Sequence, residues 1–405
     1  MNKNIKKVRH LILTSLALSA IFLPSAYGNH RTGSLALPEL IVAGDWNGDG
    51  SVDLAVNVTG FDNVAIFRGD GQGGFSVKRH IVSDTLNKGL ATADFNRDGH
   101  LDLVTATAWG YDLDIYQGDG LGGFTSQGQL KGDGEPTRLF LKDVNNDGNL
   151  DIVVNAPDEG KILIYFGDDK GNFVVPAEEI ELGDLGKDFD LSVVDFNGDG
   201  NLDIAATDIT SNGANGAKVV VFRGDGLGGF TMTSAFPVNA LPTTIEARDL
   251  NNDGKPDMIV AGALPGNHTG NFLSTYLGDG AGNFTARQTI DLGAGNLKGL
   301  VAVGDFNEDG NLDVAYPVTG IQSPVHSTTI LVFFGNGTGS LVAGPILTVG
   351  QEPHTVIAVD VNHDGHLDLV NTNRTDGTIS VLLGDGHGNF AAPTFYSVLC
   401  DTCLE

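Results

Sequence analysis

A nine-residue pattern of acidic and amide side chains, Asp-x-Asn-x-Asp-Gly-x-x-Asp, occurs seven times in the chain, beginning at Asp45, Asp94, Asp143, Asp195, Asp249, Asp305 and Asp360. Positions 1, 3, 5 and 9 of each copy carry side-chain oxygens, and position 6 is Gly, which permits a sharp turn. Calcium binds about six to eight such hard oxygens in proteins. The pattern therefore predicts a calcium-binding loop, which we call the Asp loop.

Each loop is expected to add the backbone carbonyl of position 7 to these side chains, with water completing the shell. We expect calcium rather than magnesium, which demands stricter octahedral geometry, and up to seven Ca²⁺ per chain. The predicted donors are Asp45, Asn47, Asp49, Ser51 and Asp53; Asp94, Asn96, Asp98, His100 and Asp102; Asp143, Asn145, Asp147, Asn149 and Asp151; Asp195, Asn197, Asp199, Asn201 and Asp203; Asp249, Asn251, Asp253, Lys255 and Asp257; Asp305, Asn307, Asp309, Asn311 and Asp313; and Asp360, Asn362, Asp364, His366 and Asp368.

Two other interpretations of the pattern are weaker. An EF-hand would place Glu at position 12, where this chain has residues such as Val56 and Thr105. Clusters of Asp, Asn and Gly also form turns without a metal, because their side chains bond to their own backbone. Three carboxylates in nine residues argue against turns alone, since charges without a counterion repel one another at close range.

The spacing of the loops identifies the repeating unit. Successive copies start 49, 49, 52, 54, 56 and 55 residues apart, and a glycine turn, Gly-Asp-Gly-x-Gly-x-Phe, recurs in step with them. This turn begins at Gly69, Gly118, Gly224, Gly278 and Gly384, with degraded copies at Gly167 and Gly335. Seven units of about fifty residues, each with two turns, predict a repeat architecture.

Short runs of branched and aromatic residues between the turns predict strands. In the second unit the expected strands A, B, C and D lie at 89–93, 101–107, 113–116 and from 124 onward. Four antiparallel strands repeated seven times predict an all-β, seven-bladed β-propeller, in which ring closure protects the sheet edges. An open solenoid would need capping repeats at its ends, and we find none in the sequence, so a closed ring is favoured. We expect one propeller domain over 29–405, with repeats over about 40–399 and at most one strand from the preceding segment.

The two ends of the chain suggest an exported protein. Basic residues before an apolar stretch over 11–23, followed by small residues, predict a signal peptide over 1–28; the alternative is an uncleaved anchor. Cys400 and Cys403, in a tail over 400–405, predict a local disulfide rather than a redox or haem-binding motif.

Composition narrows the classes of partner. The formal net charge of −28 would repel nucleic acid. We find no apolar run long enough for a membrane span beyond the N-terminus. The expectation is a secreted, extracellular, periplasmic or cell-surface monomer.

The paired Asp loop and glycine turn resemble the FG-GAP or VCBS-type repeats that build the propeller of the integrin alpha head. The resemblance covers nearly all of 40–399 and implies a calcium ion in each hairpin between strands A and B. It places these ions on the face opposite the B to C and D to A loops. It does not extend to the further domains and membrane helix of an integrin alpha chain, so an integrin function is not implied.

The ligand site is predicted from one irregularity in the repeats. The distance from loop position 9 to the glycine turn is 16, 16, 16, 21, 21, 22 and 16 residues, so three consecutive B to C loops, over 208–216, 262–271 and 317–328, are longer. Binding residues concentrate on such loops, although neutral insertion is an equal alternative. The polar candidates are Asn212, Asn267, His268 and His326, and Trp109 and Tyr111 are candidates for stacking on a sugar.

These observations favour a calcium-binding propeller that acts as a binding or adhesion module for an extracellular carbohydrate or protein. The alternatives are a polysaccharide-acting lyase or hydrolase and a purely structural assembly protein. No Gly-x-Ser-x-Gly motif occurs, and the histidines are scattered. Arg68-Gly69-Asp70 and Arg223-Gly224-Asp225 spell an adhesion tripeptide, but each is simply the start of a glycine turn.

Overall fold

The computed structural model describes residues 36–399 except 61–62, 83–86, 108–110, 133, 135, 176–177, 183–188, 209–215, 239–240, 264–270, 294–298 and 319–327. The predicted signal peptide over 1–28 and the predicted disulfide between Cys400 and Cys403 lie outside the described residues.

The described residues form seven four-stranded antiparallel sheets, which we number as blades 1 to 7 in chain order. The strands are β1 Leu37–Gly44, β2 Asp53–Thr59, β3 Asn63–Gly69 and β4 Phe75–Val82; β5 Asn87–Ala93, β6 Asp102–Thr107, β7 Asp112–Gly118 and β8 Phe124–Lys131; β9 Leu139–Lys142, β10 Asp151–Ala156, β11 Lys161–Tyr165 and β12 Glu178–Glu181; β13 Leu191–Val194, β14 Asp203–Asp208, β15 Lys218–Gly224 and β16 Phe230–Pro237; β17 Leu241–Arg248, β18 Asp257–Ala263, β19 Asn271–Gly278 and β20 Phe284–Gly293; β21 Ala302–Gly304, β22 Asp313–Val318, β23 Thr329–Gly335 and β24 Leu341–Thr348; and β25 Pro353–Val359, β26 Asp368–Asn373, β27 Thr378–Leu382 and β28 Thr394–Ser397.

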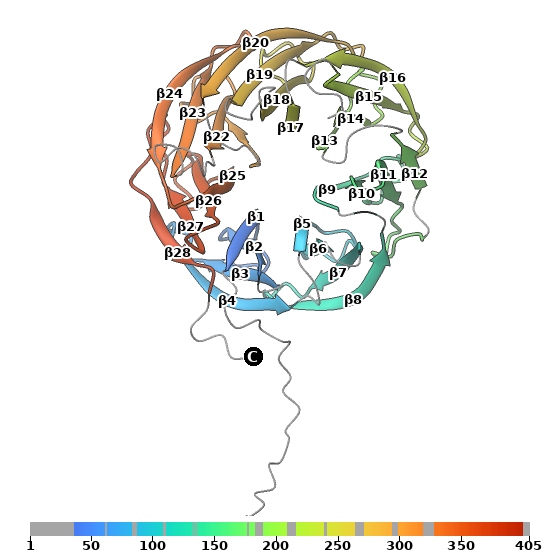
Figure 1. Cartoon of the computed structure of the whole chain (residues 1–405). Helices are drawn as coiled ribbons and strands as arrows, with labels where there is room; N and C mark the ends of the chain where they lie inside the picture. Colours follow the sequence, from blue (N-terminus) through green and yellow to red (C-terminus); the bar gives the residue numbers. More distant parts are fainter. Residues whose placement is uncertain are drawn as a thin grey trace, which may run out of the picture.

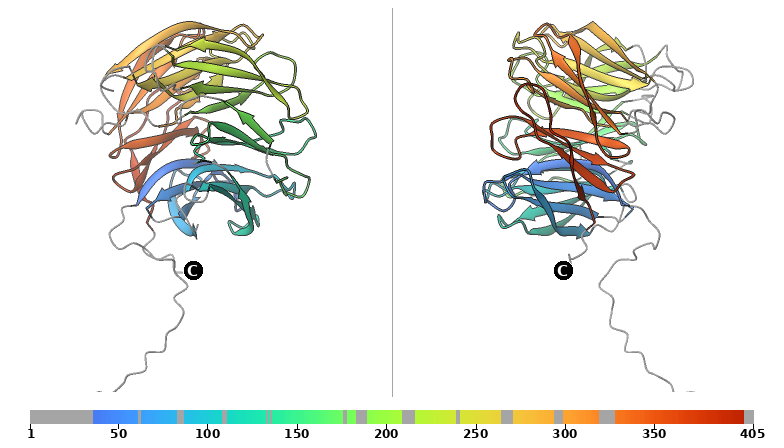
Figure 2. Two further views of the ribbon diagram at one scale, coloured as in Figure 1. Left: turned by 45° about the vertical axis from the view of Figure 1, so that its right-hand side comes forward. Right: turned by 90° about the vertical axis from the view of Figure 1, so that its left-hand side faces the viewer.

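The blades stand around a central channel as a seven-bladed propeller (Figure 1), which confirms the predicted all-β fold. The first strand of each blade lines the channel and the fourth lies at the rim. The view turned by 90° shows the ring from its side as a thick disk (Figure 2, right). Among the described residues, no helix is long and apolar enough to cross a membrane.

Burial follows from the place of each strand in its blade. Second strands such as β6 and β10 are buried along their whole length, because neighbouring blades cover both of their faces. Fourth strands such as β8 are largely exposed. The apolar side chains form seven clusters, each shared by two adjacent blades. The core is therefore a circle of seven interfaces between blades.

The aromatic residue that ends the glycine turn contributes to these interfaces. Its partner is the apolar residue at position 2 of the preceding blade's Asp loop. The rings of Trp46 and Phe124 meet edge to face with centroids 6.2 Å apart, and those of Phe196 and Phe284 with centroids 5.5 Å apart. The two sequence patterns thus meet in space between successive blades.

The ring closes between blade 7 and blade 1 through side chains. The described strands of blade 7 are consecutive in sequence, and so are those of blade 1, so no strand is exchanged between them. The Thr372 hydroxyl donates to the Glu39 carbonyl oxygen at 2.8 Å, and Arg374 Nε lies 3.1 Å from the Glu39 carboxylate. Tyr396 packs on Phe75 with ring centroids 5.9 Å apart.

The first glycine of each glycine turn is required by a close approach of two backbone segments. A Cβ on Gly224 would collide with the carbonyl oxygen of Leu202, the residue before loop position 9. The other six turns show the same collision, from Gly69 with Val52 to Gly384 with Leu367. The glycine lets strands B and C come together beside the Asp loop.

We predict that Gly224→Ala lowers the free energy of unfolding by about 1–3 kcal/mol, the usual cost of overpacking a rigid site. Leu227→Ala in the same turn is the control, since Leu227 is 82% exposed and should change stability little. Urea denaturation of both variants measures the difference. Equal stability of the two variants would contradict the close-approach argument.

Candidate functional site

The seven Asp loops lie on one face of the ring. Each loop joins the first and second strands of its blade, and hydrogen bonds link several pairs of neighbouring loops. Asn146 Nδ2 donates to Asn201 Oδ1 at 2.8 Å, which links the loops of blades 3 and 4. Asn252 Nδ2 donates to Asn311 Oδ1 at 3.1 Å between blades 5 and 6. All seven loops therefore lie on the same face of the ring, which is the arrangement that the resemblance implied.

The aspartate at loop position 9 joins two separate segments of its blade. In blade 2, Asp102 Oδ2 accepts from the Phe95 backbone N–H at 3.1 Å, and Oδ1 accepts from the Gly118 N–H at 2.9 Å. The first bond holds loop position 2 and the second holds the start of the glycine turn. All seven blades repeat this pair of bonds, at 2.8–3.3 Å and 2.8–2.9 Å respectively.

These position 9 carboxylates are buried, with 0–2% of each residue exposed. Burial raises the pKa of all seven carboxyls, and the backbone hydrogen bonds oppose that rise. The pKa reaches about 6 in Asp102, Asp151 and Asp313. In blade 2 the carboxylates of Asp98 and Asp94 add to the rise. Each buried charge therefore lacks full compensation from its hydrogen bonds.

The other oxygen-bearing positions shape the loop itself. In all seven loops, position 1 accepts from the N–H of Gly at position 6 at 2.8–2.9 Å. Position 3 accepts from the N–H of position 5, and position 5 accepts from that of position 7. The position 6 glycines have φ between +81° and +90°, which confirms the predicted sharp turn.

The donor set of each loop fits calcium in its chemistry. Every candidate donor is a hard oxygen, and a carboxylate oxygen that accepts one N–H keeps a lone pair for a cation. Within the described ranges, no three His, Cys, Asp or Glu side chains gather at metal-ligand spacing. The predicted donor set also includes the Asn amide oxygen and the position 7 carbonyl oxygen, and it stays a prediction.

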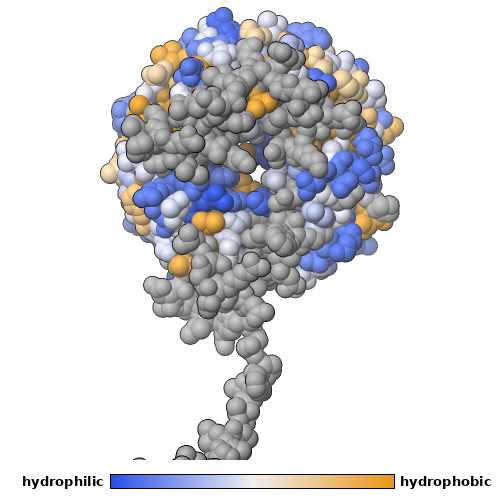
Figure 3. Space-filling model, viewed as in Figure 1, coloured by the Kyte–Doolittle hydropathy of each residue, from blue (hydrophilic) through white to orange (hydrophobic). Residues whose placement is uncertain are grey.

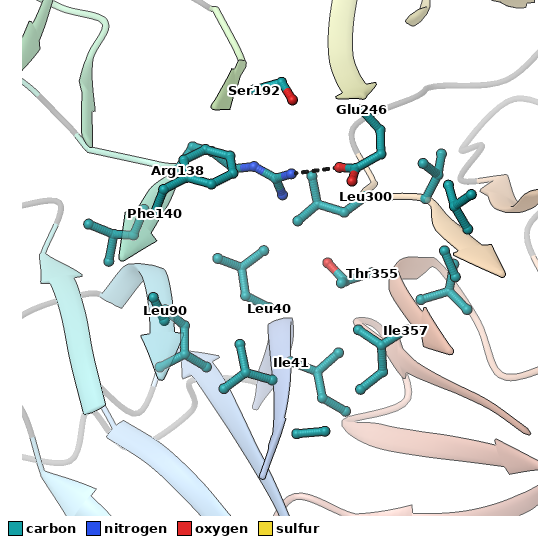
Figure 4. A pocket seen from close by; sticks show the side chains of 18 of the residues that line it. Leu40, Ile41, Leu90, Arg138, Phe140, Ser192, Glu246, Leu300, Thr355 and Ile357 are labelled. Atoms are coloured by element: carbon teal, nitrogen blue, oxygen red, sulfur yellow. Dashed lines mark hydrogen bonds and ion pairs between the residues drawn. The ribbon is translucent and has the colours of Figure 1, made fainter. Parts of the chain in front are cut away.

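The central channel encloses a cavity of about 620 Å³ lined by the first strands of the blades. Figure 3 views the ring along its axis and shows a narrow opening near the centre with hydrophilic residues beside it. One side of the cavity wall is apolar, with Leu40, Leu90, Leu300 and Ile357 (Figure 4).

Blades 3 to 5 contribute charged residues to this channel, and sequence analysis had not singled them out. Arg138 points across the channel toward Glu246 (Figure 4), with Nη2 3.4 Å from Oε2, and its Nε lies 3.3 Å from Asp190 Oδ1. Glu246 also pairs with Arg248 at 2.6 Å. Burial raises the pKa of Asp190 and of Glu246, against the effect of Arg138. Arg138 and Asp190 directly precede β9 and β13, and Glu246 lies within β17.

The three long connections lie between strands B and C, as expected. Nine, seven and ten residues separate β14 from β15, β18 from β19 and β22 from β23, against three or four in the other blades. The predicted ligand residues Asn212, Asn267, His268, His326 and Trp109 all lie outside the described residues.

Tyr111 is the one predicted ligand residue that the structure describes. It precedes β7 at the B to C connection of blade 2, is 41% exposed and has φ of +60°. A left-handed backbone is uncommon for a bulky aromatic residue, and such strain gathers at functional positions. Tyr111 therefore stays a candidate for ligand contact.

We predict that Asp102→Ala lowers stability in the presence of a chelator, where metal loss plays no part. The Phe95 and Gly118 N–H groups would lose their acceptors, at a cost of about 1–3 kcal/mol for each group that stays buried. Asp98→Ala is the matched control, since its backbone partner is exposed to water. Thermal and urea unfolding in EDTA compare the two. If both variants unfold like the parent chain, the hydrogen bonds of the position 9 carboxylate do not stabilise the blade.

Comparisons with known proteins agree with this geometry. A crystal structure of a functionally unknown protein from Desulfotomaculum acetoxidans is 12% identical, with TM-score 0.56 over 78% of this chain and 87% of that chain. A protein from Lactobacillus plantarum is 14% identical, with TM-score 0.58 over 89% and 96%. At such low identity they show the fold alone. Among curated proteins no match is found.

The family model described as FG-GAP-like repeat matches residues 45–105, 94–154, 143–206, 206–260 and 249–316. These matches follow the Asp loops from one blade to the next and together span more than half of the chain. The chain therefore belongs to the FG-GAP-like repeat family.

Proposed function

We propose that this protein is a secreted, calcium-binding propeller that acts as a binding module for an extracellular carbohydrate or protein. The observation that carries the proposal is the contrast between the two faces of the ring. Every Asp loop repeats the same backbone N–H to side-chain hydrogen bonds on one face, whereas the B to C connections on the other face are longer in three blades than in the other four. A uniform scaffold with variable loops is the arrangement typical of binding proteins.

Calcium is proposed as a structural ion. Each Asp loop holds three carboxylates, one of them buried, and the pKa of that buried group is raised by its surroundings. A divalent cation bound to the loop would neutralise this charge and stabilise the folded chain. The loop residues would orient their oxygens toward it through the N–H bonds described above. Secretion fits this role, because extracellular calcium modules work at about 10⁻⁴ to 10⁻³ M.

The ligand is proposed to bind on the face opposite the Asp loops. The three long connections belong to consecutive blades 4, 5 and 6, so they are neighbours in the ring. The exposed Tyr111 stands at the corresponding connection of blade 2. A tyrosine ring offers a rigid apolar face with a polar tip, which suits contact with a sugar or a protein.

We predict that chelation lowers the melting temperature and that millimolar Ca²⁺ restores it, because ligand bound only to the folded state adds to stability. At about 100-fold excess over Kd, one site contributes about 2.7 kcal/mol. Differential scanning calorimetry with EDTA, Ca²⁺ and Mg²⁺ tests this. Identical unfolding curves in EDTA and Ca²⁺ would refute structural calcium.

For the binding role, we predict that the calcium-loaded protein is retained on a subset of a glycan and matrix-protein array. Trimming the three long connections to the length found in blade 3 should abolish that retention while the melting temperature and calcium binding stay unchanged. Tyr111→Ala should weaken retention if blade 2 takes part. Release of shortened polysaccharide products would instead support the enzymatic alternative, and unchanged retention by the trimmed variant would place the site elsewhere.

A further inference from the structure

In two of the seven blades, an arginine from outside the Asp loop bonds to a carboxylate of that loop. The second Asp loop has an arginine of its own, Arg97 at position 4, whose guanidinium donates instead to the Gly148 carbonyl oxygen of the blade 3 loop. Arg68 and Arg223 immediately precede the glycine turns of blades 1 and 4. Arg68 Nη2 and Nε lie 2.7 and 3.3 Å from Oδ2 of Asp49 at loop position 5. Arg223 makes the same pair of bonds to Asp199 Oδ2, at 2.5 and 3.1 Å. In both loops, a guanidinium group occupies an oxygen of the predicted donor set.

The other five loops lack this arrangement. The corresponding residue before the glycine turn is Gln117, Phe166, Leu277, Phe334 or Leu383. Lys255 approaches Asp253 in blade 5, but only at 3.8 Å between two exposed side chains. For blades 2, 3, 6 and 7, the ion pairs found in the described part of the chain include none from Lys or Arg to a loop carboxylate.

The same two loops differ in their internal hydrogen bonds. In blade 1 the amide of Asn47 donates to Asp53 at position 9, at 2.8 Å, and Asn197 of blade 4 does the same to Asp203 at 3.0 Å. In blades 2, 3, 6 and 7 the position 3 amide donates instead to the position 5 carboxylate. In blades 1 and 4 the position 3 amide thus reaches the position 9 carboxylate, which it does not do in those four blades.

Loop position 4 distinguishes the same two blades in sequence. It is Gly48 in blade 1 and Gly198 in blade 4, with φ of +68° and +73°. The other five loops have a side chain there, in a left-handed conformation with φ between +56° and +60°. The arginine bond and the glycine at position 4 thus separate these two loops from the other five, and the position 3 hydrogen bond separates them from those of blades 2, 3, 6 and 7.

We infer that Arg68 and Arg223 act as resident cations that make the first and fourth Asp loops weak calcium sites, so that five loops bind calcium tightly. The inference rests on the proposed calcium role. A guanidinium would repel Ca²⁺ and compete for a position 5 oxygen. Coulomb repulsion between charges of +1 and +2 about 5–6 Å apart in water weakens binding by about tenfold.

The experiment is a calcium titration of the full chain by isothermal calorimetry, with the number of bound ions counted by native mass spectrometry. The parent chain should show about five tight sites and two sites about tenfold weaker. Arg68→Gln and Arg223→Gln should each convert one weak site to a tight one, and the double variant should show seven tight sites.

Two further variants provide the controls. Arg287→Gln removes the same charge from an exposed arginine whose guanidinium bonds to Thr338 rather than to a loop carboxylate. It should leave all site affinities unchanged. Gln117→Arg places arginine before the glycine turn of blade 2 and should reduce the tight sites from five to four. Melting temperatures in EDTA check that every variant folds.

The outcomes separate this inference from the calcium proposal. Seven equivalent sites in the parent chain, or unchanged affinities in Arg68→Gln and Arg223→Gln, would overturn the two-class inference and leave calcium binding standing. No binding of Ca²⁺ at millimolar concentration would overturn both. An equal gain in affinity from Arg287→Gln would attribute the effect to net charge and so overturn the assignment to Arg68 and Arg223.

Discussion

The buried aspartate at loop position 9 is the interaction on which the rest of this propeller depends. Its carboxylate holds the start of the Asp loop with one oxygen and the start of the glycine turn with the other. The first bond fixes the residue at loop position 2, whose side chain packs against the aromatic residue of the next blade. A single carboxylate therefore organises its own blade and positions that blade against its neighbour.

This arrangement has an electrostatic cost. When no cation is bound, the charged form of a carboxylate that is almost fully buried beside two others is destabilised, as its raised pKa indicates. Calcium is the proposed counterion for the loop carboxylates, and an arginine paired with the position 5 carboxylate is a second source of positive charge. Blades 1 and 4 have the second, through Arg68 and Arg223. The scaffold thus keeps its repeated position 9 hydrogen bonds both in blades whose loop pairs with an arginine and in blades whose loop does not.

Much of the fold could be predicted because the two repeated turns mark where each strand begins and ends. Position 6 glycines, the glycine turn and the apolar runs each have a local physical cause, so strands A to D of blade 2 were predicted close to their observed bounds. The role of Asp102 as a tie to Gly118 was not predicted, since 16 residues separate them and the bond exists only after strands B and C pair.

The channel charges and loop arginines escaped prediction for a related reason. Arg138 meets Glu246 across 108 positions of sequence, and only the packing of blades 3 to 5 around the channel brings them together. Arg68 was interpreted solely as the start of a turn, because its pairing with Asp49 depends on how strand C returns beside the loop. The structure tests the predicted ligand-binding residues least, because Tyr111 is the only one of them among the described residues.

The way the ring closes gives the molecule a cyclic rather than a linear order. Blade 7 meets blade 1 through the same kind of apolar cluster that joins every other pair, and each sheet is complete in its own stretch of chain. Among the described strands, no sheet combines segments from both ends of the polypeptide, so the order of the sheets around the ring does not depend on where the chain starts. Moving the termini to another gap between blades would preserve every sheet, and a blade could be duplicated or replaced as a unit during evolution.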